Sequence, residues 1–420
     1  MAISREIFRL LINEGQELIK DVELYDREYN LEDNGRYVLV GVRQAGKSYM
    51  LYKRAKQLLA EGHLLEEIVY IDFDDERLLE MTAEDFDLIL QTYKSMYSHK
   101  PILLFDEIQN IAGWEHFARR LANQKYLVYL TGSNAKMLSK DIHTTLGGRY
   151  LDEVVYPYSF AEYVDSQNIR RSREWMYNSE RFEVEKALSE YMKWGGFPEL
   201  LLYKNKRRWL NDIYEKILLN DIISRNKIKN EMAIRLFVKR LAENVTKPVS
   251  YTRLSNLIKA SGVSTTPASI IQYAEYVKDA YVIFALENYA SKFVEKSTVK
   301  KHYFIDNGLL SIFASESQSA LLENLCAIQL LRKYEDKLYY YNKNIEVDFY
   351  VPEEGLAIQA CVTLDDLETK DREINALKKL DGLENLRRMV IVTQYDEEMI
   401  SLPNGKSIEI VPAWKWLLKE

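Results

Sequence analysis

The chain has 420 residues, a net charge of −7 and 47% hydrophobic residues. This composition predicts two to four domains with ordinary globular cores, and no stretch is long and apolar enough to span a bilayer, so we expect no membrane partner. Two cysteines are too few for a disulfide framework, and the five histidines are too scattered for a zinc site. The first segment is unlike a signal peptide, so we expect a cytoplasmic protein.

The first predicted elements are a strand, a loop and a helix. The apolar residues 37–40 indicate a buried strand, and residues 49–60 indicate a helix. The loop between them fits the pattern G-x-x-x-x-G-K-[ST], in which backbone N–H groups surround phosphate oxygens. The residues that we expect to contact a nucleotide are Gly41, Arg43, Gln44, Ala45, Gly46, Lys47, Ser48 and Tyr49.

Two side chains of this loop have separate predicted roles. Lys47 is expected to reach the β- and γ-phosphates, and Ser48 to hold Mg²⁺. A chance glycine turn before a helix would give the same letters, but the strand–loop–helix context favours the phosphate site. The sequence therefore predicts a site for a nucleoside triphosphate and Mg²⁺.

Strands and helices continue to alternate through the first third. Residues 68–73, 101–107 and 126–131 indicate buried strands, and residues 83–97 indicate a helix. Apolar strands separated by helices predict an α/β domain whose parallel sheet is covered on both faces. Because ligands of such sheets bind beyond the carboxyl ends of the strands, the phosphate loop and the polar residues after the later strands should meet there.

The third strand ends in two acids. Asp106 follows four apolar residues, and we expect it to hold Mg²⁺ through water. Glu107 is the candidate base that polarises the attacking water. The alternative is an acidic strand end that caps the next helix, but the phosphate loop upstream favours the catalytic role.

Polar residues after the fourth strand allow two interpretations. Ser133 and Asn134 stand where a polar sensor is expected between the nucleotide and water. They also suit the N-cap of a helix beginning near Ala135. Both roles are compatible.

One arginine is a candidate for the completion of the site. Arg149 lies in a Gly-Gly-Arg segment after a loop, where it would reach the γ-phosphate in a neighbouring subunit and stabilise the transition state. Arg119 and Arg120 are rivals for this role. The alternative is a structural arginine paired with an acid.

The motifs together resemble a prokaryotic family of AAA-type ATPases, and the resemblance covers essentially the whole chain. The segments that carry it are residues 41–48, 103–109, 131–134, 147–149, 156–163, 194–199 and 304–309. The resemblance implies ATP hydrolysis with Mg²⁺, a homo-oligomer and contact with double-stranded DNA. It also implies four parts: a P-loop core at residues 1–160, a helical lid at 161–230, a winged helix at 231–300 and a restriction-endonuclease-like α/β domain at 301–420.

The pattern of the middle region fits this division. Residues 181–194 and 206–227 indicate two amphipathic lid helices. Three further helices and two strands then follow in the order of a winged helix. Their predicted ranges are residues 231–244, 250–259, 265–279, 281–286 and 299–305. The third helix would read DNA with an exposed face of Thr265, Thr266, Ser269, Gln272 and Tyr273.

The charge of this region is opposite to that of the whole chain. Residues 201–260 contain fourteen Lys/Arg and five Asp/Glu, a net charge of +9, which leaves −16 for the rest. Such asymmetry is typical of a surface that contacts a phosphate backbone. The alternatives are solvated lysine-rich helices and a winged helix that serves in protein interaction or oligomerisation.

The last region contains part of a nuclease pattern. Restriction-like nucleases place an acid on a helix, an aspartate on a strand and Glu-x-Lys on the next strand, and Glu323 and Asp348 fit the first two positions. Gln359 and Cys361 stand where the glutamate and lysine are expected. Glutamine is a poor Mg²⁺ ligand, and cysteine supplies no fixed positive charge. We therefore predict a degenerate domain without nuclease activity.

These observations favour an ATPase that couples its nucleotide state to DNA or partner binding. Lys47, Glu107 and Arg149 are the predicted catalytic residues, and Ser48 and Asp106 the predicted metal ligands. Two other hypotheses stay open at this point: an ATP-gated nuclease, and a nucleotide-dependent scaffold with little hydrolysis.

Overall fold

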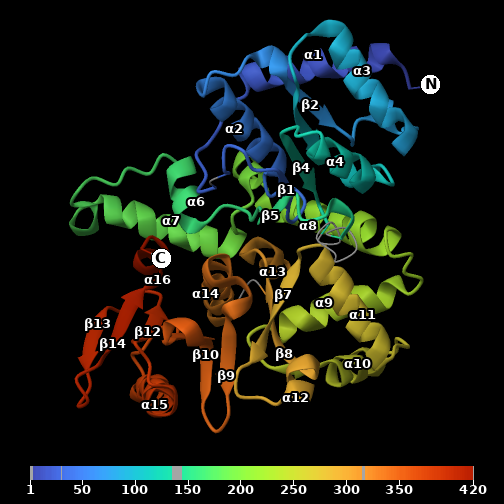
Figure 1. Cartoon of the computed structure of the whole chain (residues 1–420). Coiled ribbons are helices and arrows are strands. Elements are labelled where there is room, and N and C mark those ends of the chain that lie inside the picture. Colours follow the sequence, from blue (N-terminus) through green and yellow to red (C-terminus); the bar gives the residue numbers. More distant parts are fainter. Residues whose placement is uncertain (1–2, 30, 135–143, 315–316, 420) are drawn as a thin grey trace. The chain divides into compact units, whose positions relative to one another are not determined.

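A computed structural model describes residues 3–29, 31–134, 144–314 and 317–419. The chain divides into two units, Met1–Tyr156 and Pro157–Glu420 (Figure 1). No helix in the described ranges is long and apolar enough to cross a membrane.

The first unit is built on a parallel sheet of five strands in the order β2-β3-β4-β1-β5. Its strands are β1 (Tyr37–Val40), β2 (Ile68–Asp72), β3 (Ile102–Asp106), β4 (Val128–Gly132) and β5 (Leu151–Val154). The first four are almost wholly buried and apolar, which explains why the sequence shows them as continuous hydrophobic runs. The predicted α/β class with a parallel sheet is confirmed. β5 is partly exposed, and its sequence carries no such run.

Four helices pack on this sheet. They are α1 (Arg5–Asp21), α2 (Lys47–Ala60), α3 (Phe86–Met96) and α4 (Trp114–Asn123). α1 packs against α3 and β2, whereas α2 and α4 pack against β4. α1 begins at a serine N-cap and buries the stripe of Phe8, Leu11, Ile12 and Ile19, so its amphipathic sequence accounts for its position.

The second unit contains a mixed sheet of nine strands in the order β13-β14-β12-β11-β10-β9-β7-β8-β6. The strands nearer the N-terminus are β6 (Val249–Ser250), β7 (Ile283–Asn288), β8 (Val299–Phe304), β9 (Tyr339–Asn342) and β10 (Glu346–Val351). The remaining ones are β11 (Leu356–Ala360), β12 (Arg388–Thr393), β13 (Glu398–Ser401) and β14 (Ser407–Pro412).

Helices of the second unit fall into two groups along the chain. The first group is α6 (Phe160–Ser166), α7 (Glu180–Trp194), α8 (Lys206–Lys216), α9 (Glu231–Glu243), α10 (Tyr251–Ala260) and α11 (Pro267–Asp279). The second group is α12 (Phe293–Thr298), α13 (Asn307–Ala314), α14 (Gln318–Tyr334), α15 (Leu367–Glu384) and α16 (Ala413–Leu417). The single helix predicted for residues 206–227 changes character at Ile217, where α8 continues as a π-helix to Ser224.

The elements between α9 and β8 follow the predicted helix and strand order. β8 pairs antiparallel with both β6 and β7, which makes a small sheet beside the three helices. β7 also pairs parallel with β9, so one sheet continues across residue 300, where we placed a domain boundary. The predicted reading face is partly wrong: Thr265 and Tyr273 are buried in the core, while Thr266 and Gln272 are exposed.

A buried carboxylate joins two of the motif segments within the second unit. Asp306, just before α13, accepts hydrogen bonds of 2.7 Å from the backbone N–H groups of Gly196 and Gly308. A Cβ added to Gly195 would lie 1.9 Å from an Asp306 oxygen, and the φ of Gly195 is +77°, so only glycine suits this place. Burial raises the pKa of Asp306 to about 6.

Candidate active site

The predicted phosphate loop lies at the carboxyl ends of adjacent parallel strands. β1 runs between β4 and β5, and β4 pairs in turn with β3. Val40 lies opposite Gly132, and Asp106 at the end of β3 lies opposite Asp72 of β2. Because all these strands end at one edge of the sheet, the loop after β1 meets the acids after β3.

The loop needs glycine at its first position. A Cβ on Gly41 would lie 2.1 Å from the carbonyl oxygen of Val155, and φ of Gly41 is +149°. Gly46, with φ of +100°, is the N-cap of α2 and has no side chain to cap it. The first N–H groups of α2 therefore point out of the helix start without a capping side chain, as a phosphate site requires.

Lys47 is buried and lies within the loop that it would serve. Its ammonium donates to the carbonyl oxygens of Gly41 at 3.3 Å and Val42 at 3.2 Å. It also lies 3.6 Å from Oε1 of Glu107. These contacts are long for charge-assisted hydrogen bonds, so a phosphate oxygen would be a better partner than any that Lys47 has here.

Asp106 is a buried carboxylate with several donors. It accepts hydrogen bonds from the hydroxyls of Tyr70, at 2.9 Å, Thr131 and Ser48. Burial, followed by the charge of Glu107, raises the pKa of Asp106 despite these donors. The contact with Ser48 brings together the two predicted Mg²⁺ ligands.

Glu107 is held in an unusual backbone conformation with φ of 49°. Its backbone N–H donates to Thr131 Oγ1 at 2.9 Å, and its carboxylate accepts a hydrogen bond from the Gln109 amide. Burial opposes ionisation, but the charges of Lys47 and Arg43 and the hydrogen bonds from Gln109 and Ser133 together outweigh it, and the pKa of Glu107 is lowered. The carboxylate is therefore ionised at neutral pH, as a base must be.

Four residues that the sequence analysis did not single out support the site. Tyr70 and Thr131 orient Asp106, and Tyr52 donates to the Tyr70 hydroxyl at 3.0 Å. Arg27 is buried and donates to the carbonyl oxygens of Ala45 at 2.9 Å and Tyr156 at 2.7 Å. For Tyr70 and Thr131 the available signal was a hydroxyl near the end of a buried strand, which is too common a feature to be specific, and no sequence pattern marked Tyr52 or Arg27.

The polar residues after β4 reach the site, while the arginine candidates lie elsewhere. Ser133 and Asn134 are buried, and Ser133 helps to lower the pKa of Glu107. The helix expected from Ala135 lies outside the described residues. Arg149 is exposed and donates to the carbonyl oxygens of Leu146 and Gly147 in its own turn. Arg120 pairs with Asp87 at 2.5 Å.

Within the described ranges, no three or more His, Cys, Asp or Glu side chains are arranged to hold a metal ion. Asp106 and Ser48 are one carboxylate and one hydroxyl. This donor set fits a Mg²⁺ that takes its other oxygens from a triphosphate and from water.

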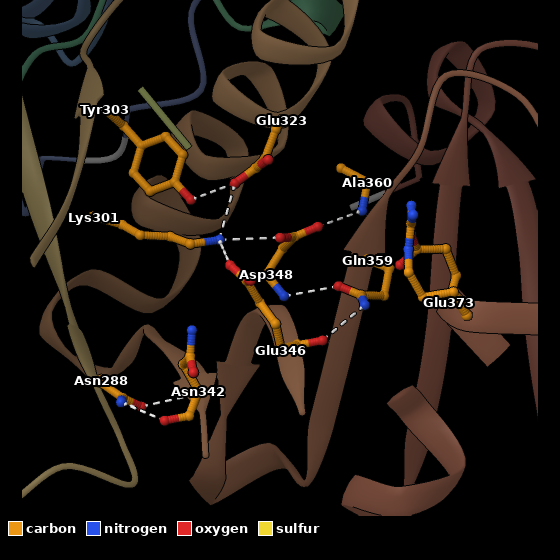
Figure 2. A network of polar contacts seen from close by, with 11 residues as sticks. Asn288, Lys301, Tyr303, Glu323, Asn342, Glu346, Asp348, Gln359, Ala360 and Glu373 are labelled. Carbon is orange, nitrogen blue, oxygen red and sulfur yellow. Dashed lines mark hydrogen bonds and ion pairs between the residues drawn. The ribbon is translucent and has the colours of Figure 1, made fainter. Parts of the chain in front are cut away.

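The residues predicted for a nuclease centre come together in the second unit (Figure 2). Glu323 on α14 and Asp348 on β10 face one ammonium, that of Lys301 on β8. The Gln359 side chain bonds instead to the backbone of β10. Cys361 follows β11, and its thiol donates to the carbonyl oxygen of Thr363 at 3.1 Å. Lys301 is the member of this cluster that the spacing of the motif did not reveal.

Comparison with other proteins gives matches over most of the chain. Residues 33–164 match an AAA domain, and residues 185–320 match a domain of unknown function. An uncharacterized protein of Methanocaldococcus jannaschii is 32% identical, over 98% of this chain and 95% of the relative. An uncharacterized protein of Haemophilus influenzae is 28% identical, over 91% of this chain and 94% of the relative.

Two solved structures are also similar at low identity. Aeropyrum pernix ORC1 in complex with DNA is 12% identical with a TM-score of 0.34, over 79% of this chain and 95% of that one. AMPPCP-bound DnaA from Aquifex aeolicus is 16% identical with a TM-score of 0.26, over 66% and 89%. At these scores the two likenesses carry no argument about this chain.

Proposed function

This chain belongs to a family of AAA-domain proteins, and on that premise we propose that it binds ATP with Mg²⁺ and hydrolyses the γ-phosphate bond. The observation that carries the proposal is the convergence of three groups at one sheet edge. Lys47 lies in the loop after β1, and its ammonium is 3.6 Å from Glu107, which directly follows the buried Asp106 of β3.

Each of these groups has a distinct part. The N–H groups at the start of α2 and the Lys47 ammonium bind the phosphates. Ser48 and Asp106 hold Mg²⁺, which neutralises charge on the β- and γ-phosphate oxygens. Glu107 accepts a proton from the attacking water, because its carboxylate is ionised and is oriented by Gln109.

We propose that a second copy of the chain completes the site. Arg149 is exposed, and its guanidinium bonds only weakly to its own turn, with N–O distances of 3.0 and 3.4 Å. A neighbouring γ-phosphate would attract it more strongly than these neutral carbonyl oxygens. The nucleotide would then control assembly of a homo-oligomer.

The proposed partner is double-stranded DNA. Lys204, Lys206 and Arg207 line an open pocket of about 430 Å³ together with Trp194, Asn205 and Glu190, and Lys206 pairs with the Glu190 carboxylate at 2.8 Å. Cations beside an aromatic ring suit a phosphate backbone with an adjacent base or sugar. The exposed face of α11 is polar rather than basic, so we propose contact with little sequence preference. A protein partner is the alternative for the same surface.

Phosphate release from ATP tests the proposal. We expect Mg²⁺-dependent turnover that falls about 10²- to 10⁴-fold in Glu107→Gln, with ATP binding retained. Glu76→Gln is the matched control, because this exposed glutamate lies on a 3₁₀ turn after β2 and its change alters the charge equally. Equal turnover in the wild type and Glu107→Gln would contradict the catalytic role.

Light scattering separates the ATPase from a scaffold. We expect the apo, ADP and ATP forms to differ in size and the ATP form to turn over. A size change without turnover would favour a scaffold that ATP merely assembles. Measured with and without duplex DNA, the same samples show whether DNA changes the rate, as coupling requires.

A further inference from the structure

Lys301 is a charged side chain in the interior of the second unit (Figure 2). Its side chain is 1% exposed, and it comes from β8, which lies between β7 and the edge strand β6 of the nine-stranded sheet. A buried ammonium is tolerated only where oppositely charged groups surround it, because its removal from water costs several kcal/mol. The groups that surround the Lys301 ammonium therefore determine which cation is stable at this position.

Three carboxylates from two elements meet at this ammonium. Nζ lies 3.1 Å from Asp348 Oδ1 and 3.1 Å from Glu346 Oε1, both on β10. It lies 3.4 Å from Oε1 of Glu323 on α14. The ammonium donates hydrogen bonds to Glu323 and Asp348 and forms an ion pair with Glu346.

Neighbouring groups fix the positions of these carboxylates. Asp348 Oδ2 accepts the N–H of Ala360 at 3.1 Å, and Glu323 Oε1 accepts the hydroxyl of Tyr303 at 2.7 Å. The Gln359 amide accepts from the Asp348 N–H at 2.8 Å and donates to the Glu346 carbonyl oxygen at 3.1 Å. Hydrogen bonds therefore hold Glu323 and Asp348 in place around the cation. We call Glu323, Glu346 and Asp348 the carboxylate cage.

The negative charge of the carboxylate cage is larger than the single positive charge of the Lys301 ammonium. Two carboxylates on β10 already outnumber the one ammonium, which leaves an excess of negative charge beside the carboxyl group of Glu323, and carboxylate oxygens are the ligands that Mg²⁺ and Mn²⁺ prefer. The Glu346 side chain is half exposed, so the cage also has a side that opens to solvent.

We propose that the Lys301 ammonium takes the place of a divalent cation among Glu323, Glu346 and Asp348, so that these carboxylates hold no metal ion in this protein. The Lys301 ammonium supplies the positive charge that a bound metal ion would otherwise supply to these carboxylates. Because the ammonium occupies the centre of the cage, this part of the chain performs no metal-dependent cleavage of nucleic acid. This inference is independent of the proposed ATPase activity.

Mn²⁺ binding to the nucleotide-free full chain tests the proposal, with electron paramagnetic resonance as the readout. We expect Lys301→Met to bind one more Mn²⁺ per chain than the wild type, and the double variant Lys301→Met/Asp348→Asn to lose that ion. The control is Lys300→Met, because the adjacent lysine pairs with Glu287 at 3.1 Å instead of facing the cage. It should bind as the wild type does.

A second comparison, between the wild type and Asp348→Asn, does not require the Lys301→Met protein to fold. Wild-type and Asp348→Asn proteins should bind the same number of Mn²⁺ ions, because the lysine excludes the metal from the cage. A folded Lys301→Met protein without the additional ion would overturn the proposal. So would a wild-type ion that disappears in Asp348→Asn. Recovery of an unfolded Lys301→Met protein on addition of Mn²⁺ would support it.

Discussion

The two units each place a buried lysine beside carboxylates, and the difference between the two sites is instructive. Lys47 has two loop carbonyls and one glutamate at 3.2 to 3.6 Å. Lys301 has three carboxylates at 3.1 to 3.4 Å and is fully enclosed. The contacts are of similar length, so the two sites differ in the charge of the partners. Lys47 lies beside two neutral carbonyl oxygens and one carboxylate, which a phosphate can replace, whereas all three partners of Lys301 are carboxyl groups.

The largest expected difference between the two sites is in stability. Lys301→Met leaves buried carboxylates without a counter-ion, so we expect the free energy of unfolding to fall by about 3–5 kcal/mol. Lys300→Met, one residue away and partly exposed, should change it by less than about 1 kcal/mol. Urea unfolding measured without divalent ions checks both. A Lys301→Met protein as stable as Lys300→Met would show that the cage does not need its cation.

The pH dependence of stability sharpens the comparison at Glu323. Burial, followed by the charge of Asp348, raises the pKa of Glu323 to about 8, from 4.5 for the free side chain. A raised carboxyl pKa adds stability that is present at low pH and is lost as pH rises through the folded value. Relative to Glu323→Gln, the wild type should lose about 3 kcal/mol between about pH 6 and about pH 8.

Urea unfolding of the two proteins at each pH provides the measurement. Asp306, with a pKa raised to about 6, is present in both and cancels in the difference. Parallel pH profiles would contradict a shifted Glu323.

Tyr70→Phe tests the carboxylate on the nucleotide side. The change removes the 2.9 Å hydrogen bond to Asp106 and keeps the ring, at a cost of about 2 kcal/mol for a bond to a charged group. We expect the Mg²⁺ concentration needed for half-maximal turnover to rise about 10- to 30-fold. Tyr93→Phe is the matched control, because its hydroxyl bonds to the carbonyl oxygen of Glu66. A loss of stability without any change in Mg²⁺ dependence would limit Tyr70 to a structural role.

The smallest expected effect on stability is that of Lys47→Met. Its ammonium lies near a single carboxylate, that of Glu107 at 3.6 Å, so the free energy of unfolding should fall by less than it does in Lys301→Met. ATP binding, measured by calorimetry on the same protein, should be lost. A destabilisation as large as that expected for Lys301→Met would erase the distinction between the two lysines.

The sequence predicted the strands and helices of the first unit well, because their features are local in the chain. The strand, loop and helix around Lys47 are contiguous, and the acids directly follow the apolar run of β3. Parallel strands bring their carboxyl ends together whatever the details of packing, so the approach of Glu107 to Lys47 follows from the sheet class alone. The interpretation of α11 failed at Thr265 and Tyr273, because the rotation of a helix depends on what packs against it.

Tertiary structure alone decided the carboxylate cage. Lys301, Glu323 and Asp348 come from β8, α14 and β10, and no spacing rule joins a lysine on one strand to acids 22 and 47 residues later. The order β10-β9-β7-β8 of the sheet and the packing of α14 bring them together. The sequence by itself thus determined the strand, loop and helix around Lys47, since backbone geometry follows local residues. Only the fold determined which charges meet, because charge pairing depends on distances through space.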